Sequence, residues 1–88
     1  MRAPTFDLTL LRTLVAIADT GSVTAAATRL AYTQSTVSMQ LQRLEAQLEM
    51  RLHERDGRRL RFTAEGERLL AHARHLLALN DEAWSDMQ

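Results

Sequence analysis

Apolar residues recur at helical spacing in residues 33–48, the segment TQSTVSMQLQRLEAQL. Val37, Leu41, Leu44 and Leu48 follow one another at intervals of four, three and four residues. At about 3.6 residues per turn, this spacing places all four side chains on one stripe of a helix. The pattern therefore predicts a helix over about residues 34–48 that buries this stripe.

Two shorter helices are predicted before this segment. Asp7 is suited to cap a helix over residues 8–20, which Gly21 stops, and Ser22 can cap an Ala-rich helix over residues 23–30. A short turn then leads into the segment described above. Two helices joined in this way form the helix-turn-helix arrangement, although the short turn by itself also fits any antiparallel helical pair.

A β-hairpin is predicted next, because Asp56-Gly57 lies between two short segments, residues 52–55 and 58–63. Leu60 and Phe62 alternate with arginines, as a half-buried strand requires. A basic hairpin after a helix-turn-helix is typical of a wing, which can follow the DNA backbone and place an arginine in a narrow minor groove. The alternative is a solvated edge hairpin protected by charge. The arginines here are Arg51, Arg55, Arg58, Arg59 and Arg61.

The face of the 34–48 helix opposite its apolar stripe carries mainly short polar and amide side chains. Such side chains can hydrogen-bond base edges or hold a phosphate, and a methionine can contact a thymine methyl group. The same residues also occur on ordinary exposed faces. We expect base contacts from the early turns, at Gln34, Ser35, Ser38 and Met39. Expected backbone or minor-groove contacts come from Ser22, Thr24, Thr33, Thr36, Gln42, Arg43, Arg55, Arg58 and Arg59.

A long last helix is predicted over residues 64–88, with Thr63 as its cap. Its apolar stripe is longer than so small a domain can cover, which favours a partner helix. The alternative is a helix that lies on the core of its own domain, and Trp84 could also pack against a domain further along the chain. The residues expected at a dimer interface are Leu69, Leu70, Ala73, Leu76, Leu77, Asn80 and Trp84.

Charge is segregated along the chain, although the net charge is zero. Residues 1–62 hold nine Arg and six acidic residues, and residues 63–88 hold two Arg and five acidic residues, so the two parts carry +3 and −3. All eleven basic residues are Arg, the side chain best suited to bidentate phosphate or guanine contact. The basic part coincides with the predicted helix-turn-helix and wing, which favours a nucleic-acid partner there.

Other classes of function find little support in the sequence. No segment reaches the roughly 20 apolar residues of a membrane span, no secretory signal is visible, and there is no cysteine. His72 and His75 are three residues apart, but nothing nearby completes a metal site, so we expect exposed histidines. No phosphate loop, activated nucleophile or carboxylate pair is present, and we expect neither an enzyme nor a cofactor. A cytoplasmic location is the default.

Three segments resemble the DNA-binding domain of LysR-type transcriptional regulators: LLRTLVAIADTGSVTAAATRL, TQSTVSMQLQRLEAQLEMRLHER and GRRLRFTAEGERLLAHAR. They follow one another in the order and spacing of the family, from about Leu8 to Asn80. TQSTVSMQLQRLE and LALNDEAW look most like the LrhA/HexA branch. Four positions depart from the usual pattern of the family. Ser35 replaces a proline, Met39 an arginine, Glu49 a helix-ending glycine and His53 an aromatic residue.

The resemblance implies a mainly α fold: a winged helix-turn-helix over residues 1–63, with three helices and a small β-hairpin wing. A linker helix over residues 64–88 would pair antiparallel with its copy in a second subunit, with Asn80 helping to fix the register. Arg58 would enter the minor groove of operator DNA. Family members act as homodimers or tetramers and carry an effector-binding domain after the linker helix, which we expect to be absent from this chain. The runner-up function is a helical protein-protein interaction module.

Overall fold

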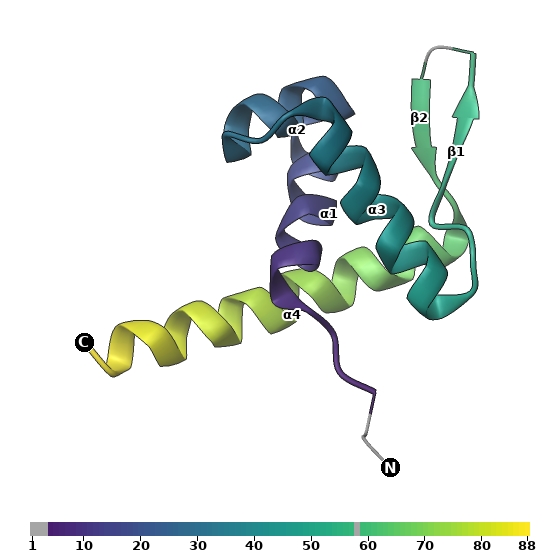
Figure 1. Cartoon of the computed structure of the whole chain (residues 1–88). Helices are drawn as coiled ribbons and strands as arrows, with labels where there is room; N and C mark the ends of the chain where they lie inside the picture. The colour runs from purple at the N-terminus through teal and green to yellow at the C-terminus, as the bar shows by residue number, and fades with distance from the viewer. Residues whose placement is uncertain (1–3, 58) are drawn as a thin grey trace.

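A computed structural model describes residues 4–57 and 59–88 as four helices and a two-stranded antiparallel hairpin (Figure 1). The elements are α1 (Leu8–Thr20), α2 (Val23–Leu30), α3 (Gln34–Leu48), β1 (His53–Asp56), β2 (Arg59–Phe62) and α4 (Ala64–Asp86). This order confirms the predicted winged helix-turn-helix with a long last helix. Within the described ranges, no helix combines the length and the hydropathy that a membrane span requires.

Side chains fix where each helix begins. The residue before each helix accepts a hydrogen bond from a backbone N–H two or three residues further on, which satisfies one of the N–H groups that the first turn leaves unpaired. The four capping residues are Asp7, Ser22, Thr33 and Thr63. All four were predicted from the sequence or lie where the predicted helices begin.

A residue in the left-handed backbone conformation ends each of the first three helices. Gly21 has φ of 85° after α1, as expected of glycine. Ala31 and Glu49 take the same region after α2 and α3, with φ of 59° and 53°. Glu49 therefore supplies the left-handed cap that glycine gives in the family, and it does so with a side chain that disfavours this conformation.

The core forms around α1, which packs against α2, α3 and α4. Leu11, Leu14 and Ile17 of α1 are almost completely buried, and they meet the predicted stripe of Val37, Leu41 and Leu44 on α3. Thr13 is a polar residue buried with this core, and its hydroxyl donates a hydrogen bond to the Gln40 side chain of α3. The orientation of α3 is thus fixed by apolar burial and by one specific polar contact.

The two halves of α4 lie in different surroundings. The helix packs on α1 and the core as far as Leu77 and Asp81, and its C-terminal end projects away from the domain (Figure 1). Two ion pairs tie α4 to α1, Arg12 with Asp81 at 2.5 Å and Arg74 with Asp19 at 2.7 Å. The hydrogen bonds from Arg74 and Arg12 lower the pKa of Asp19 and of Asp81 below the ordinary carboxyl range. Both pairs therefore stabilise the packing above the ordinary carboxyl pKa, and this contribution is lost as the pH falls through the lowered values.

Three residues expected at the dimer interface lie in the core instead. Leu69, Ala73 and Leu77 are 7%, 0% and 7% exposed within the single chain. In the single chain these three side chains therefore cover the apolar surface of their own domain, and their contact with a second subunit stays a prediction. Leu70 is partly buried, and Leu76, Asn80 and Trp84 keep surface outside the core.

Gly66 marks the closest approach of α4 to the rest of the domain. A Cβ added at this residue would lie 2.0 Å from the carbonyl oxygen of Leu52, where real contacts stay above 3.0 Å. That oxygen accepts the Thr63 N–H at 3.0 Å. The chain can therefore pass from the wing into α4 at this distance only with glycine at position 66.

We expect Gly66→Ala to destabilise the domain by about 1–3 kcal/mol, because the added methyl group must push backbone away from backbone. This loss should outweigh the roughly 1 kcal/mol that alanine gains over glycine inside a helix. Urea denaturation measures the difference, and Ser85→Ala, at an exposed position of α4, serves as the control. An alanine variant as stable as the original chain would contradict the tight approach.

Candidate nucleic-acid interface

The outward face of α3 presents the residues predicted to contact bases. Gln34 and Ser35 are exposed, Met39 is 49% exposed, and Ser38 is partly buried. They lie in the first turns of the helix, at the end that follows the short turn from α2 (Figure 1). These side chains are therefore free to meet a ligand that approaches the N-terminal part of α3.

Predicted site residues from three separate segments line one groove of about 280 Å³. Ser22 and Thr24 come from the start of α2, Gln34 and Ser38 from α3, and Arg55 from β1. Gly21, Val23 and Leu60 of β2 complete the lining. The groove thus combines amide, hydroxyl and guanidinium groups, which suit phosphate oxygens and base edges.

The register of the hairpin decides which wing arginine joins this groove. Arg55 pairs with Leu60, and Leu60 packs against the core, so Arg55 lies on the face of the hairpin that turns towards α3. Arg59 pairs with Asp56, on the opposite face. The structure therefore brings Arg55 together with Gln34 and Ser38 and leaves Arg59 apart from them.

Asp56 and Arg59 form the last pair of the ladder, so Asp56 is a strand residue. The predicted turn at Asp56-Gly57 thus begins only after Asp56. Gly57 has φ of 65°, the left-handed conformation that tight hairpin turns require. Arg58, predicted to enter the minor groove, lies outside the described residues.

The remaining wing arginines differ in whether an acidic side chain is near. Arg61 lies 3.5 Å from Asp56, and Arg51 lies 3.9 Å from Glu45. In the part of the chain that the structure describes, Arg55 and Arg59 have no carboxylate within 4.0 Å. Because their charge is not compensated locally, these two are better placed than Arg51 and Arg61 to attract an anion.

Three predicted backbone contacts also serve the fold. The hydroxyls of Ser22 and Thr33 accept backbone N–H groups as helix caps. The Thr33 hydroxyl also lies 3.0 Å from that of Thr36. Thr24, Gln42 and Arg43 are exposed, and Gln42 and Arg43 lie further along α3. Replacing Ser22 or Thr33 would therefore change helix stability as well as any contact with a ligand.

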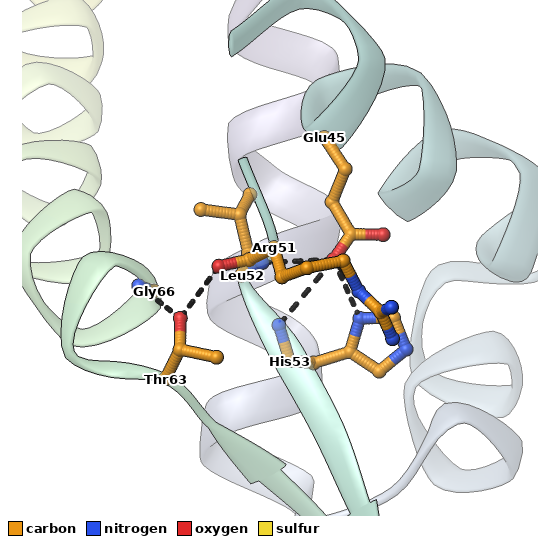
Figure 2. A network of polar contacts seen from close by, with 6 residues as sticks. All are labelled: Glu45, Arg51, Leu52, His53, Thr63 and Gly66. Atoms are coloured by element: carbon orange, nitrogen blue, oxygen red, sulfur yellow. Dashed lines mark hydrogen bonds and ion pairs between the residues drawn. The ribbon is translucent and has the colours of Figure 1, made fainter. Parts of the chain in front are cut away.

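Glu45 connects α3 to the base of the wing, a role that the sequence analysis missed. One oxygen of its carboxylate accepts the Leu52 N–H at 2.8 Å and the His53 N–H at 3.4 Å, and it lies 3.0 Å from His53 Nδ1 (Figure 2). The side chains of Glu45 and His53 are only 13% and 19% exposed. Glu45 is the single acidic residue between positions 34 and 48, which was the signal available in the sequence.

Thr63 connects the same segment, residues 51–53, to the start of α4. Its hydroxyl donates to the Arg51 carbonyl at 2.7 Å and accepts the Gly66 N–H at 3.0 Å (Figure 2). Residues 51–53 are thus hydrogen-bonded to Glu45 of α3 on one side and to Thr63, the cap of α4, on the other. These hydrogen bonds set the position of the wing, and with it the position of Arg55.

A helix-turn-helix with a basic wing, in which both elements line one groove, defines the class of winged helix-turn-helix proteins. The model of the family described as "Bacterial regulatory helix-turn-helix protein, lysR family" matches residues 8–67. The chain belongs to this family.

Individual relatives and solved structures agree with this family. The HTH-type transcriptional regulator PecT of Dickeya dadantii is 46% identical across 93% of this chain, which spans 28% of the length of PecT. The crystal structure of the BenM_DBD/catB site 1 DNA complex is similar to this chain, with a TM-score of 0.88 and 35% identity. The similarity covers 93% of this chain and 92% of the chain in that complex. The CbnR_DBD-DNA complex has a TM-score of 0.86 and 34% identity, with coverages of 93% and 94%.

We expect Glu45→Ala to lower the free energy of unfolding by about 1–3 kcal/mol, because it leaves partly buried N–H groups without an acceptor. Glu45→Gln keeps an acceptor oxygen and should lose less. Urea denaturation measures both variants, and Gln47→Ala, at an exposed position of α3, is the control. A Glu45→Ala variant that unfolds like the control would show that the wing is held by other contacts.

Proposed function

We propose that this chain binds double-stranded operator DNA as the DNA-binding part of a LysR-type transcriptional regulator. In this proposal α3 lies in the major groove and the wing meets the neighbouring minor groove. The observation that carries it is the single groove lined by Ser22, Thr24, Gln34, Ser38 and Arg55. Structures similar to this chain include two DNA complexes, which supports the same assignment.

The groups in the groove suggest a division of roles. Gln34 and Ser38 can hydrogen-bond base edges, and Met39 can contact a thymine methyl group. Ser22, Thr24 and Arg55 flank them and are suited to phosphate oxygens. Phosphate contacts make affinity fall steeply with salt, whereas a helical protein-interaction module would show no such dependence on duplex DNA.

Replacing Gln34 or Ser38 by Ala should relax base preference at particular operator positions, since one good direct contact gives about 1–3 kcal/mol of discrimination. Competition with duplexes that carry single base changes measures this effect. Gln47→Ala, at the other end of α3, should keep the original preference. Equal losses of affinity for all sequences, or no loss, would show that α3 does not select the bases.

The wing gives a separate prediction for Arg58, which we propose to enter the minor groove beside the half-site. An arginine there responds to groove width, so operators with A·T-rich flanks should bind more tightly. Arg58→Ala should weaken binding and remove this flank preference, whereas Arg61→Ala, beside Asp56, should keep it. A flank preference that survives in Arg58→Ala would transfer the role to Arg59.

We propose that the chain dimerises through the second half of α4. The C-terminal end of this half extends beyond the domain, and the half exposes Leu76, Leu79 and Met87, which are 38%, 51% and 78% exposed. Of the residues predicted at the interface, Leu70, Leu76, Asn80 and Trp84 remain candidates. Two linked half-site contacts would give a dimer much tighter binding to a two-half-site operator than to one half-site.

Leu76→Asp should convert dimers to monomers in analytical ultracentrifugation, because it places a carboxylate in an apolar interface. Ala78→Asp introduces the same group at an exposed position on the opposite side of α4 and is the matched control. Operator binding should weaken far more than half-site binding in the Leu76 variant alone. Dimers that persist in this variant would place the interface on another surface.

Membership of the family suggests what the rest of the regulator contains. Because the chain spans 28% of the length of PecT, we propose that an effector-binding domain and any tetramer contacts belong to the remainder of a longer protein. We propose a cytoplasmic location for the regulator, where operator DNA would be available to it. Its relatives are transcriptional regulators, and we propose no enzymatic activity for it. Membership of the LrhA/HexA branch stays a prediction.

A further inference from the structure

His53 and Arg55 lie on the inner face of the wing, the face that packs on the domain. They are two residues apart on β1, so their side chains point to the same side of the hairpin. Their partners in the ladder, Phe62 and Leu60, pack against the core. The opposite face carries charged residues: Glu54, Asp56, Arg59 and Arg61. His53 therefore occupies the base of the inner face, and Arg55 follows it towards the groove that α3 also lines.

The imidazole of His53 connects the wing to α3 through a side-chain contact. Its Nδ1 lies 3.0 Å from Oε2 of Glu45 (Figure 2). A carboxylate can only accept, so the ring donates this hydrogen bond. The backbone N–H of His53 lies 3.4 Å from the same oxygen, which is beyond the roughly 2.7–3.2 Å of an ordinary hydrogen bond. At this residue the side chain therefore contributes more to the attachment than the backbone does.

Little water reaches the contact between His53 and Glu45. Their side chains are 19% and 13% exposed, so the hydrogen bond competes with few water molecules and is stronger than one on an open surface. Arg51 lies 3.9 Å from the same Oε2, but its side chain is 76% exposed, and solvent screens its attraction to Glu45. The ring of His53 is therefore held in one orientation relative to α3.

Arg55 depends on this attachment for its own place. Beyond His53 the three remaining residues of β1 are exposed and pair with β2. Among the described residues no carboxylate lies within 4.0 Å of Arg55, so no ion pair directs its side chain. Two positions along a strand span about 7 Å. A rotation of β1 at His53 would therefore turn Arg55 away from the groove.

We propose that His53 positions Arg55 for DNA binding: held by Glu45, it directs the guanidinium group to a phosphate of the operator beside the bases that α3 reads. This inference rests on the DNA-binding function proposed above. The side chain of His53 is largely buried against Glu45, so its effect on DNA passes through Arg55. Phenylalanine, an aromatic residue of the kind usual here in the family, would fill the same space without a donor for Glu45.

A double-mutant cycle tests whether His53 acts through Arg55. His53→Phe should weaken operator binding about 3- to 10-fold, a coupling typical of residues in one network. In the Arg55→Ala variant the same substitution should change affinity less than about 2-fold, because the contact is already lost. In the Arg59→Ala variant, on the opposite face of the wing, it should cost as much as in the original chain. Fluorescence anisotropy of a labelled duplex measures each affinity.

Salt dependence identifies which contact is lost. The slope of log affinity against log salt concentration should fall by up to about 0.9 in His53→Phe and in Arg55→Ala, the value for one phosphate contact, and no further in the double variant. His53→Asn, whose amide group can donate from about the place of Nδ1, should keep most of the original affinity and slope. Urea denaturation measures the stability of each variant.

The outcomes separate the positioning role from the function on which it rests. A His53→Phe protein that binds DNA like the original chain, or a loss that persists in full in the Arg55→Ala variant, would overturn the positioning role. So would a loss of affinity that accompanies lower stability and leaves the salt slope unchanged, since it would mark a purely structural residue. An original chain that does not bind duplex DNA would overturn the proposed function, and the positioning role with it.

Discussion

The junction at Leu52 is the contact on which the arrangement of this domain depends. Its side chain is fully buried, its N–H donates to Glu45 of α3, and its carbonyl accepts the N–H of Thr63. Gly66 of α4 packs directly against that carbonyl. A single residue thus contacts the recognition helix, the start of the wing and the last helix.

This junction explains how a basic hairpin becomes part of a binding groove. A two-stranded hairpin alone is only marginally stable in water, and this one is held by Leu60 and Phe62 against the core and by Glu45 at its base. With the base fixed, the register of the strands directs Arg55 towards Gln34 and Ser38. His53 replaces the aromatic residue usual in the family, and it keeps a place in this arrangement by binding Glu45 while it pairs with Phe62.

The last helix has a buried apolar surface and an exposed one, which the sequence pattern does not separate. Leu69, Ala73 and Leu77 complete the core of their own domain, and Leu76, Leu79, Trp84 and Met87 stay exposed beside or beyond it. The same helix is therefore rigidly attached to the DNA-binding unit and available to a second subunit. Such an attachment would let an assembly on α4 fix the spacing of two recognition helices, as half-site recognition requires.

The sequence by itself determined the elements, because helix periodicity, capping side chains and turn glycines act between residues a few positions apart. It also placed Gln34, Ser38 and Arg55 among the candidate site residues, because their chemistry suits DNA and their positions follow from those elements. Only the tertiary structure decided which face of α4 is buried, which wing arginine joins the groove, and why positions 45 and 66 carry Glu and Gly. Those outcomes depend on contacts between segments distant in sequence, and local spacing carries no information about which partner a side chain will meet.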